Sequence, residues 1–452
     1  MAEPAPPTES DLHRRRLTEV LGSGTRNQLV GLVNALHPAE IADLLESLPP
    51  AQREAVWELV PSDMDGDVLV HVNDEVRSGL MDGMDSKEIL AAVEGLDVDD
   101  VADLLQDLPA ALTREVLNAM DRQNRQRVEA VLPYPEDSAG GLMNTDVVTV
   151  RADVTLEVVL RYLRMRGSLP EVTDRIFVLS RSERFAGTLS LTNLLTHDPE
   201  YTVAEVMERN QETVMVDMQQ QEIARLFETH DLISAPVIDA DGNLLGRITV
   251  DDVVDVIREQ AEHQILTMAG LDEEDDMFAP VILSSRRRAV WLGVNLITAF
   301  AAAWVIGLFE ATIEQVVALA VLMPVVASMG GVAGSQTLTL MVRGLATGQV
   351  SGANAIWLLN KELAVGAVNG LLWAFVVAAI AVVWFGDLRI GAIIAVAIFI
   401  NLLCAAVSGV GIPMLLKRLG VDPALAGNVV LTTVTDVVGF MAFLGLATVF
   451  LL

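Results

Sequence analysis

The chain from Val281 to its end is dominated by long apolar stretches, and these limit the possible folds more than any other feature. Five stretches are each long enough to cross the ~30 Å hydrocarbon core of a bilayer as a helix. They cover about residues 289–309, 315–342, 354–385, 390–416 and 424–451. The sequence therefore predicts an all-α membrane domain of five helices over residues 281–452. The third and fourth helices exceed the required length, so we expect them to tilt.

The charges that flank these stretches predict an orientation. One set of flanking segments is basic, with Arg286, Arg287, Arg288, Arg343, Lys361, Lys417 and Arg418. The alternate set is acidic or neutral, with Glu310, Glu314, Asp387 and Arg389. Because Lys and Arg are enriched in cytoplasmic loops, we expect a multi-pass protein of the cell (plasma or inner) membrane. Its N-terminus would be cytoplasmic and its C-terminus outside.

A carboxylate lies inside the last apolar stretch, at Asp436. Placing a carboxylate there costs roughly 2.5–3.5 kcal/mol, so such residues are rare and mark ion paths by default. Asn428 and Thr432 precede Asp436 at helical spacing, which puts all three on one face of the helix. This polar face predicts a cation pathway. The alternative is a buried aspartate that only holds helices together.

The second apolar stretch carries a proline and several small residues, at Pro324, Gly330, Gly331 and Gly334. A proline bends a membrane helix and frees a carbonyl group, and small residues let another backbone come close. Freed carbonyls and close approach are also used by cation pathways, so we expect these four positions to line a pore. Helix packing through small residues is the alternative.

The first 280 residues are strongly acidic. They hold 22 basic and 55 acidic residues, a net charge of −33, whereas the rest of the chain holds 8 and 6. This charge argues against nucleic acid as a partner and favours divalent cations, which prefer oxygen ligands. A solvated acidic surface is the alternative. Cys404 is the only cysteine, so no intrachain disulfide can form, as is usual for a reducing compartment. We expect residues 1–27 to be a disordered tail without a signal peptide.

Residues 28–135 predict an acidic, all-α domain of repeated helices. The segment Ile41–Pro49, IADLLESLP, recurs as VADLLQDLP at Val101–Pro109. Repetition of this kind is typical of stacked helical hairpins. Asp99, Asp100 and Asp103 crowd the start of one helix, where carboxylates suit the helix dipole. They also qualify as half of a divalent-cation site.

Two further units, at residues 138–200 and 201–250, show the same order of elements. The second copy predicts strands at 213–216, 235–239 and 244–249, a helix at 220–230 and a turn at Asp241-Gly242. Tandem α/β units of this kind resemble CBS domains, which are regulatory. In that family a Gly-x-hydrophobic-Thr/Ser-x-x-Asp stretch holds the ribose of an adenine nucleotide such as ATP. Gly246, Thr249 and Asp252 match it, whereas the first copy has Asn193 at the last position.

A connecting segment over residues 251–280 begins with an acidic helix. Asp252, Asp255, Glu259 and Glu262 are spaced so that all four lie on one face. Like charges at this spacing destabilise a helix unless they are neutralised. The pattern therefore predicts bound divalent cations.

This order of parts resembles the MgtE family of magnesium channels and transporters, over about residues 28–452. The most specific pieces are the Pro-x5-Gly-Gly-x-x-Gly-Ser-Gln stretch that starts at Pro324 and Thr-Val-Thr-Asp at 433–436. The resemblance implies a homodimer with one pore on the two-fold axis, lined by the second and fifth spans. One departure is Val332, where the family usually has Asn.

The resemblance also implies roles for the acidic residues. Asp436 matches the pore aspartate that binds hydrated Mg²⁺, with Thr432 and Asn428 beside it. Asp252, Asp255 and Asp422 match positions at which a plug helix and a cytoplasmic loop share Mg²⁺ in the closed state. Asp99 and Asp103 match regulatory positions of the N-terminal domain.

We therefore expect a magnesium channel or transporter for uptake and homeostasis, gated by cytosolic Mg²⁺ at the N-terminal, CBS and plug regions. The alternatives are a carrier for Mn²⁺ or Co²⁺, or a proton-coupled cation transporter. An intramembrane metalloprotease would require His-Glu-x-x-His in a span. All six histidines precede the membrane domain, so we do not expect an enzyme.

Overall fold

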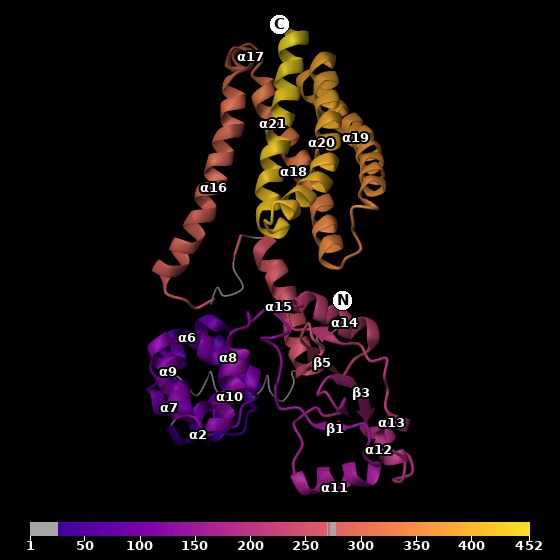
Figure 1. Ribbon diagram of the computed structural model, residues 1–452. Coiled ribbons are helices and arrows are strands. Elements are labelled where there is room, and N and C mark those ends of the chain that lie inside the picture. Colours follow the sequence, from indigo (N-terminus) through magenta and orange to yellow (C-terminus); the bar gives the residue numbers. More distant parts are fainter. Residues whose placement is uncertain (1–25, 269, 272–276) are drawn as a thin grey trace. The chain divides into compact units, whose positions relative to one another are not determined.

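The computed structural model describes residues 26–268, 270–271 and 277–452 (Figure 1). The chain divides into two compact units. The first includes the chain up to Ala261 and residues 277–279, and the second contains Glu262 and the chain from Pro280 onward. Of the expected disordered tail, residues 1–25 lie outside the described residues.

The first unit opens with a stack of short helices. Their bounds are α2 Arg26–Val33, α3 Pro38–Glu46, α4 Pro50–Trp57, α5 Asp65–His71, α6 Asp74–Met81, α7 Ser86–Ala92, α8 Val98–Gln106, α9 Ala110–Ala119 and α10 Arg122–Val131. The recurring Leu-Pro pairs mark helix boundaries, because Pro49 and Pro109 are the N-cap residues of α4 and α9. Proline suits a helix start, where its missing N–H is not needed. The all-α prediction for this domain is confirmed.

The two CBS units have the same sheet topology. Strands β1 Thr149–Arg151, β2 Arg175–Leu179 and β3 Phe185–Ser190 form one sheet in that order. Strands β4 Val214–Met215, β5 Ser234–Ile238 and β6 Leu244–Thr249 form the other. In each sheet the first pair is parallel and the second antiparallel. The helices are α11 Leu156–Arg166, α12 Leu191–Thr196, α13 Val203–Val206 and α14 Gln220–His230. The predicted tandem repeat is therefore confirmed.

Helix α15, Val250–Met268, follows the second sheet directly. The described residues of the membrane unit then form five helices that are long and apolar enough to cross a bilayer. They are α16 Val281–Gly307, α18 Ala318–Ala346, α19 Ala355–Phe385, α20 Leu388–Arg418 and α21 Pro423–Leu451, with the short α17, Glu310–Gln315, after the first. The first of them begins well before residue 289, because Arg286, Arg287 and Arg288 continue the helix.

Helix α20 lies at the centre of the membrane unit and packs against α18, α19 and α21. Glycines make this packing close. A Cβ atom at Gly409 would lie 2.7 Å from the Cβ of Thr337 on α18, and one at Gly391 would lie 2.4 Å from Val382 on α19. The close packing of α18 and α19 against α20 therefore depends on these glycines.

Candidate functional site

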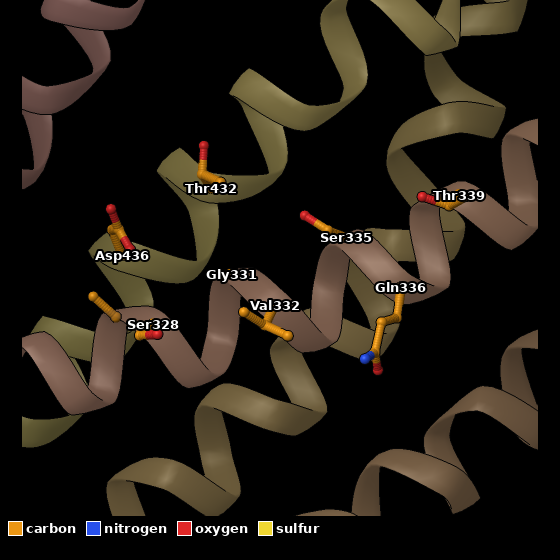
Figure 2. Close-up of a pocket in the computed structure, with 9 residues that line it drawn as sticks. Ser328, Gly331, Val332, Ser335, Gln336, Thr339, Thr432 and Asp436 are labelled. Atoms are coloured by element: carbon orange, nitrogen blue, oxygen red, sulfur yellow. The ribbon is translucent and has the colours of Figure 1, made fainter. Parts of the chain in front are cut away.

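Helices α18 and α21 form a groove of about 600 Å³ in the membrane unit (Figure 2). Nine residues line it: Ala327, Ser328, Gly331, Val332, Ser335, Gln336 and Thr339 from α18, and Thr432 and Asp436 from α21. The α18 residues recur every three or four positions, so they form one helix face. Most of the lining side chains that extend beyond Cβ are polar. The groove therefore places several polar side chains inside membrane-spanning segments.

The carboxylate of Asp436 faces this groove. Within the described ranges it has no hydrogen-bond or ion-pair partner. Thr432 lies one turn away, and its hydroxyl donates to the backbone carbonyls of Asn428 and Val429 at 2.9 and 3.1 Å. The Thr432 oxygen keeps its acceptor capacity. An unpartnered carboxylate beside hydroxyl oxygens is a donor set that suits a hard, hydrated cation.

We expected Asn428 on the same polar face as Thr432 and Asp436. In the structure its side chain is hydrogen-bonded to α18. Its Oδ1 accepts a 2.9 Å hydrogen bond from the hydroxyl of Ser335. It does not line the groove. Asn428 therefore fixes the position of a lining residue.

The four positions of α18 that were expected to line a pore separate in the structure. Gly331 borders the groove. Gly330 and Gly334 are buried on the packed side, where added Cβ atoms would lie 2.3 Å from Asn401 and 2.9 Å from Leu431. Pro324 is inside the helix, one turn before the first lining residue. For Gly330 and Gly334 the geometry favours the helix-packing alternative, and pore lining by Pro324 stays a prediction.

Two buried polar side chains of the membrane unit escaped the sequence analysis. Glu362 on α19 is 6% exposed, accepts a 3.2 Å hydrogen bond from Thr337 and lies 2.7 Å from the ammonium of Lys361. Asn401 on α20 is fully buried. Glu362 looked like a flanking charge because Lys361 precedes it, and Asn401 was one amide within an apolar stretch. Their location within spans was the available signal, because polar groups there need partners.

Acidic residues from α8 and α15 come together in the first unit. Asp99 is 6% exposed, and burial followed by the charge of Asp252 raises its pKa well above the usual range. Burial, with nearby carboxylates second, raises the pKa of Asp100 to about 7, that of Asp103 to about 8 and that of Asp252 to about 7. Buried Oδ1 atoms of Asp99 and Asp103 have no hydrogen-bond partner in the part of the chain that the structure describes. These groups repel one another when ionised, so a cation would suit them.

The described residues contain no group of three or more His, Cys, Asp or Glu side chains already arranged to hold a metal ion. Asp255 and Glu259 are exposed on α15, and Asp255 lies 3.8 Å from Arg258. Glu262 is exposed in the second unit. In that unit, Asp422 caps α21 and lies 3.6 Å from Nε2 of His263, a partner that the sequence analysis missed. A cation shared by Asp422 with Asp252 and Asp255 stays a prediction.

The residues of the nucleotide motif have structural partners. Thr249 donates to Asp252 through its backbone N–H at 3.2 Å and its hydroxyl at 3.0 Å. A Cβ atom at Gly246 would lie 2.8 Å from the carbonyl oxygen of Asn144. The adjacent Arg247 is buried and donates to the carbonyl of Glu171. These contacts explain the motif residues as parts of the CBS fold, and nucleotide binding stays a prediction.

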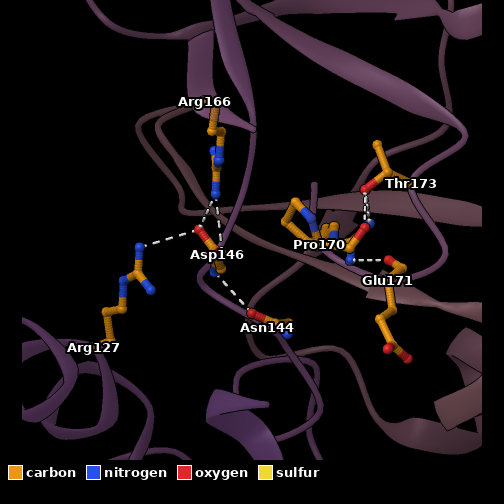
Figure 3. A network of polar contacts seen from close by, with 8 residues as sticks. Arg127, Asn144, Asp146, Arg166, Pro170, Glu171 and Thr173 are labelled. Atoms are coloured by element: carbon orange, nitrogen blue, oxygen red, sulfur yellow. Dashed lines mark hydrogen bonds and ion pairs between the residues drawn. The ribbon is translucent and has the colours of Figure 1, made fainter. Parts of the chain in front are cut away.

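The helical stack and the first CBS unit are joined at Asp146. Its carboxylate accepts hydrogen bonds from Arg127 of α10 at 3.1 Å and from Arg166 of α11 at 2.9 Å (Figure 3). Two guanidinium groups on one carboxylate leave a net positive charge at this point. These three residues therefore form a locally basic site within the acidic soluble region.

Comparison with known proteins matches three family models. They are described as a divalent cation transporter of the MgtE type over residues 323–446, the MgtE intracellular N domain over 36–137, and CBS domains over 139–200 and 203–259. Proteins named magnesium transporter MgtE are among the relatives that match. That of Thermus thermophilus is 34% identical over 442 residues, which is 96% of this chain and 98% of the relative. That of Bacillus subtilis is 26% identical over 436 residues, covering 96% and 97%.

A solved structure, described as the cytosolic domain of the Mg²⁺ channel MgtE in complex with ATP, is 35% identical. It covers 54% of this chain and 99% of the solved chain, with a TM-score of 0.49.

The five apolar helices, the tandem CBS domains and the intracellular N domain define a multi-pass membrane protein. The chain belongs to the MgtE family, because a relative 34% identical to it matches over nearly the whole of both chains.

Proposed function

We propose that this protein carries Mg²⁺ across a membrane as a channel or transporter for magnesium uptake. The observation that carries this proposal is the Asp436 carboxylate, which faces the groove between two spans and has no partner among the described residues. A charge at that depth is retained when it serves an ion path. The names of the relatives, magnesium transporter MgtE, support the same conclusion.

The chemistry of the groove favours an ion that keeps its water. Mg²⁺ gives up water reluctantly and is held through one or two carboxylates and several waters. Asp436 supplies a charge, and the oxygens of Thr432, Ser328 and Ser335 can hydrogen-bond to a water shell. Such a site holds a hydrated ion without stripping it.

A homodimer is part of the proposal. The α18–α21 groove is open along one side, and in a single chain that side would expose Asp436 to lipid. Lipid cannot solvate a carboxylate. A second copy related by a two-fold axis would cover the groove and bring a second Asp436 to the same path.

Gating by cytosolic Mg²⁺ rests on the acidic cluster of the first unit. Asp99 and Asp103 carry buried carboxylate oxygens that find no partner among the residues described, and Asp252 adds charge from α15. These residues fit a regulatory Mg²⁺, which would neutralise their repulsion and favour a compact, closed soluble region. When Mg²⁺ falls, the repulsion returns and the pore opens. Asp255, Glu259, Glu262 and Asp422 are further candidates for this regulation.

Location and boundaries complete the proposal. The basic flanks of the spans support a plasma or inner membrane location with the N-terminus in the cytoplasm and the C-terminus outside. The domain limits are residues 28–135, 138–200, 201–250, 251–280 and 281–452. An adenine nucleotide at Gly246, Thr249 and Asp252 would compete with the Thr249–Asp252 hydrogen bonds.

Reconstitution of the full chain into vesicles tests the function. Vesicles filled with a Mg²⁺-sensitive dye should report uptake of Mg²⁺ without a proton gradient. Uptake of Mn²⁺ or Co²⁺ but not Mg²⁺, or strict dependence on a proton gradient, would favour the alternative carriers. Single-channel currents with Mg²⁺ as the only permeant cation would separate a channel from a carrier.

A further inference from the structure

Asn401 lies behind the groove rather than in it. It belongs to α20, is fully buried and does not contribute to the lining. Its side-chain Nδ2 donates a 2.9 Å hydrogen bond to the backbone carbonyl of Val326 on α18. Val326 immediately precedes the lining residues Ala327 and Ser328. The Asn401 amide is therefore hydrogen-bonded to the backbone of α18 at the turn that faces the groove.

The same amide also contacts the other pore helix. An added Cβ atom would lie 2.3 Å from Nδ2 at Gly330 of α18 and 2.7 Å from Nδ2 at Gly439 of α21. Any side chain larger than hydrogen at either position would collide with the amide. Gly439 is one turn after Asp436, and Gly330 precedes the lining residue Gly331. The Asn401 amide thus sits between the two backbones that carry the groove.

Elsewhere α18 and α21 touch each other directly. A Cβ atom at Gly334 would lie 2.9 Å from Leu431 of α21, and one at Gly427 would lie 3.0 Å from Leu338 of α18. At Gly330 and Gly439, by contrast, the side chain of Asn401 from α20 occupies the space between α18 and α21. An amide is suited to that place because it combines a fixed shape with a donor for a backbone carbonyl.

We propose that Asn401 is a positioning residue for ion selection: it sets the spacing between the Ser328–Gly331 turn of α18 and the Asp436 turn of α21. The inference rests on the proposed function, because it takes Asp436 as the ion-binding group. A hydrated ion is selected by the distance between its ligands and the opposite wall. A change in this spacing therefore alters affinity and discrimination rather than only the amount of folded protein.

The test uses the full chain in vesicles with Asn401→Ala, and Gly411→Ala on the same helix as the control. No atom of the described residues lies within 4 Å of a Cβ atom at Gly411, so this variant should match the wild type. Asn401→Ala should raise the KM for Mg²⁺ roughly tenfold, as expected for a lost hydrogen bond and its packing. Discrimination of Mg²⁺ against Ca²⁺ should fall by a similar factor.

A second pair of variants tests the placement of the amide without transport. Gly330→Ala should lower the thermal unfolding temperature because its methyl group collides with Asn401. Adding Asn401→Ala should recover much of this loss, since it removes the obstacle. Two independent, additive losses would overturn the contact.

The transport outcomes separate the inference from the proposed function. Wild-type vesicles without Mg²⁺ uptake would overturn the proposed function and this inference with it. Normal wild-type uptake combined with an unchanged KM and discrimination in Asn401→Ala would overturn this inference alone. A loss of rate that is equal for both cations, with KM unchanged, would show a merely structural role and would also overturn it.

Discussion

The hydroxyl of Ser335 donates a 2.9 Å hydrogen bond to the side-chain oxygen of Asn428, and this bond joins the two helices that carry the candidate ion path. Ser335 lines the groove, whereas Asn428 stands behind it. Asn428 and Asp436 share one helical face. The side chain of Asn428 is hydrogen-bonded to α18, whereas the carboxylate of Asp436 faces the groove. One face of α21 therefore supplies both a structural hydrogen bond to α18 and the candidate ion-binding carboxylate.

The Ser335–Asn428 bond should contribute measurably to stability. Interhelical hydrogen bonds in membrane proteins contribute about 0.6 kcal/mol on average. A double-mutant cycle of Ser335→Ala and Asn428→Ala, measured by unfolding in mixed detergent, should give a coupling of about that size. Thr339→Ala is the control partner, because Thr339 lines the same groove and its side chain has no described hydrogen bond. Equal coupling of both partners to Asn428 would contradict the assignment.

Glu362 should matter as a hydrogen-bond acceptor more than as a charge. Its side chain is buried against Thr337, whereas Lys361 is 46% exposed and can be solvated. Glu362→Gln keeps the acceptor and should leave the unfolding temperature nearly unchanged. Glu362→Ala removes it and should destabilise by about 1–3 kcal/mol. If Gln proved as damaging as Ala, the ion pair with Lys361 would be the dominant interaction.

The acidic cluster should make stability fall as pH rises in the absence of divalent cations. The pKa values of Asp100 and Asp252 are raised to about 7 and that of Asp103 to about 8, above an unfolded value of about 3.8. The folded state therefore binds more protons than the unfolded state, and this stability is present below pH ~4 and lost by about pH 8.

Thermal unfolding of the full chain with a chelator should show this decline between pH 6 and pH 8. Excess Mg²⁺ should reduce it, because the cation replaces the protons. Asp103→Asn should flatten the profile, whereas the exposed Glu94→Gln should not. A profile that is flat in the chelator would show that the pKa values of these carboxyl groups are not raised in the folded state.

Neutralising the most buried acid should weaken closure by Mg²⁺. Asp99→Asn removes the charge that faces Asp252, so less Mg²⁺ is retained in the closed state. Half-inhibition of uptake should require roughly tenfold more Mg²⁺ on the side of the soluble domains, as expected for a loss of about 1.4 kcal/mol. Uptake by Glu94→Gln, measured as a function of the same Mg²⁺ concentration, is the matched control. An unchanged inhibition curve for Asp99→Asn would exclude this cluster from regulation.

Much of the architecture followed from periodicity. The span boundaries came from apolar length, and the second CBS unit from the alternation around Asp241-Gly242. The strand over Leu244–Thr249 and the helix over Gln220–His230 were predicted with the bounds that the structure shows. These features are local, because hydrophobic period and turn chemistry act over a few residues.

The site was predictable only in part, because side-chain direction depends on which helices are neighbours. The spacing of Thr432 and Asp436 gave their common face, but it could not show that Asn428 turns to Ser335. The glycines of α18 predicted close packing, but which of them borders the groove depends on where α20 lies. Asn401 and His263 were missed because their partners, Val326 and Asp422, are distant in the sequence.

The most direct test of the account is Mg²⁺ uptake by vesicles containing Asp436→Ala, compared with Asp436→Glu and the wild type. The protein should remain folded, because Asp436 has no partner within the described residues. Asp436→Ala should abolish uptake, and Asp436→Glu, which keeps the charge, should retain part of it. Uptake by Asp436→Ala at the wild-type rate and KM would contradict the assignment of this carboxylate as the ion-binding group.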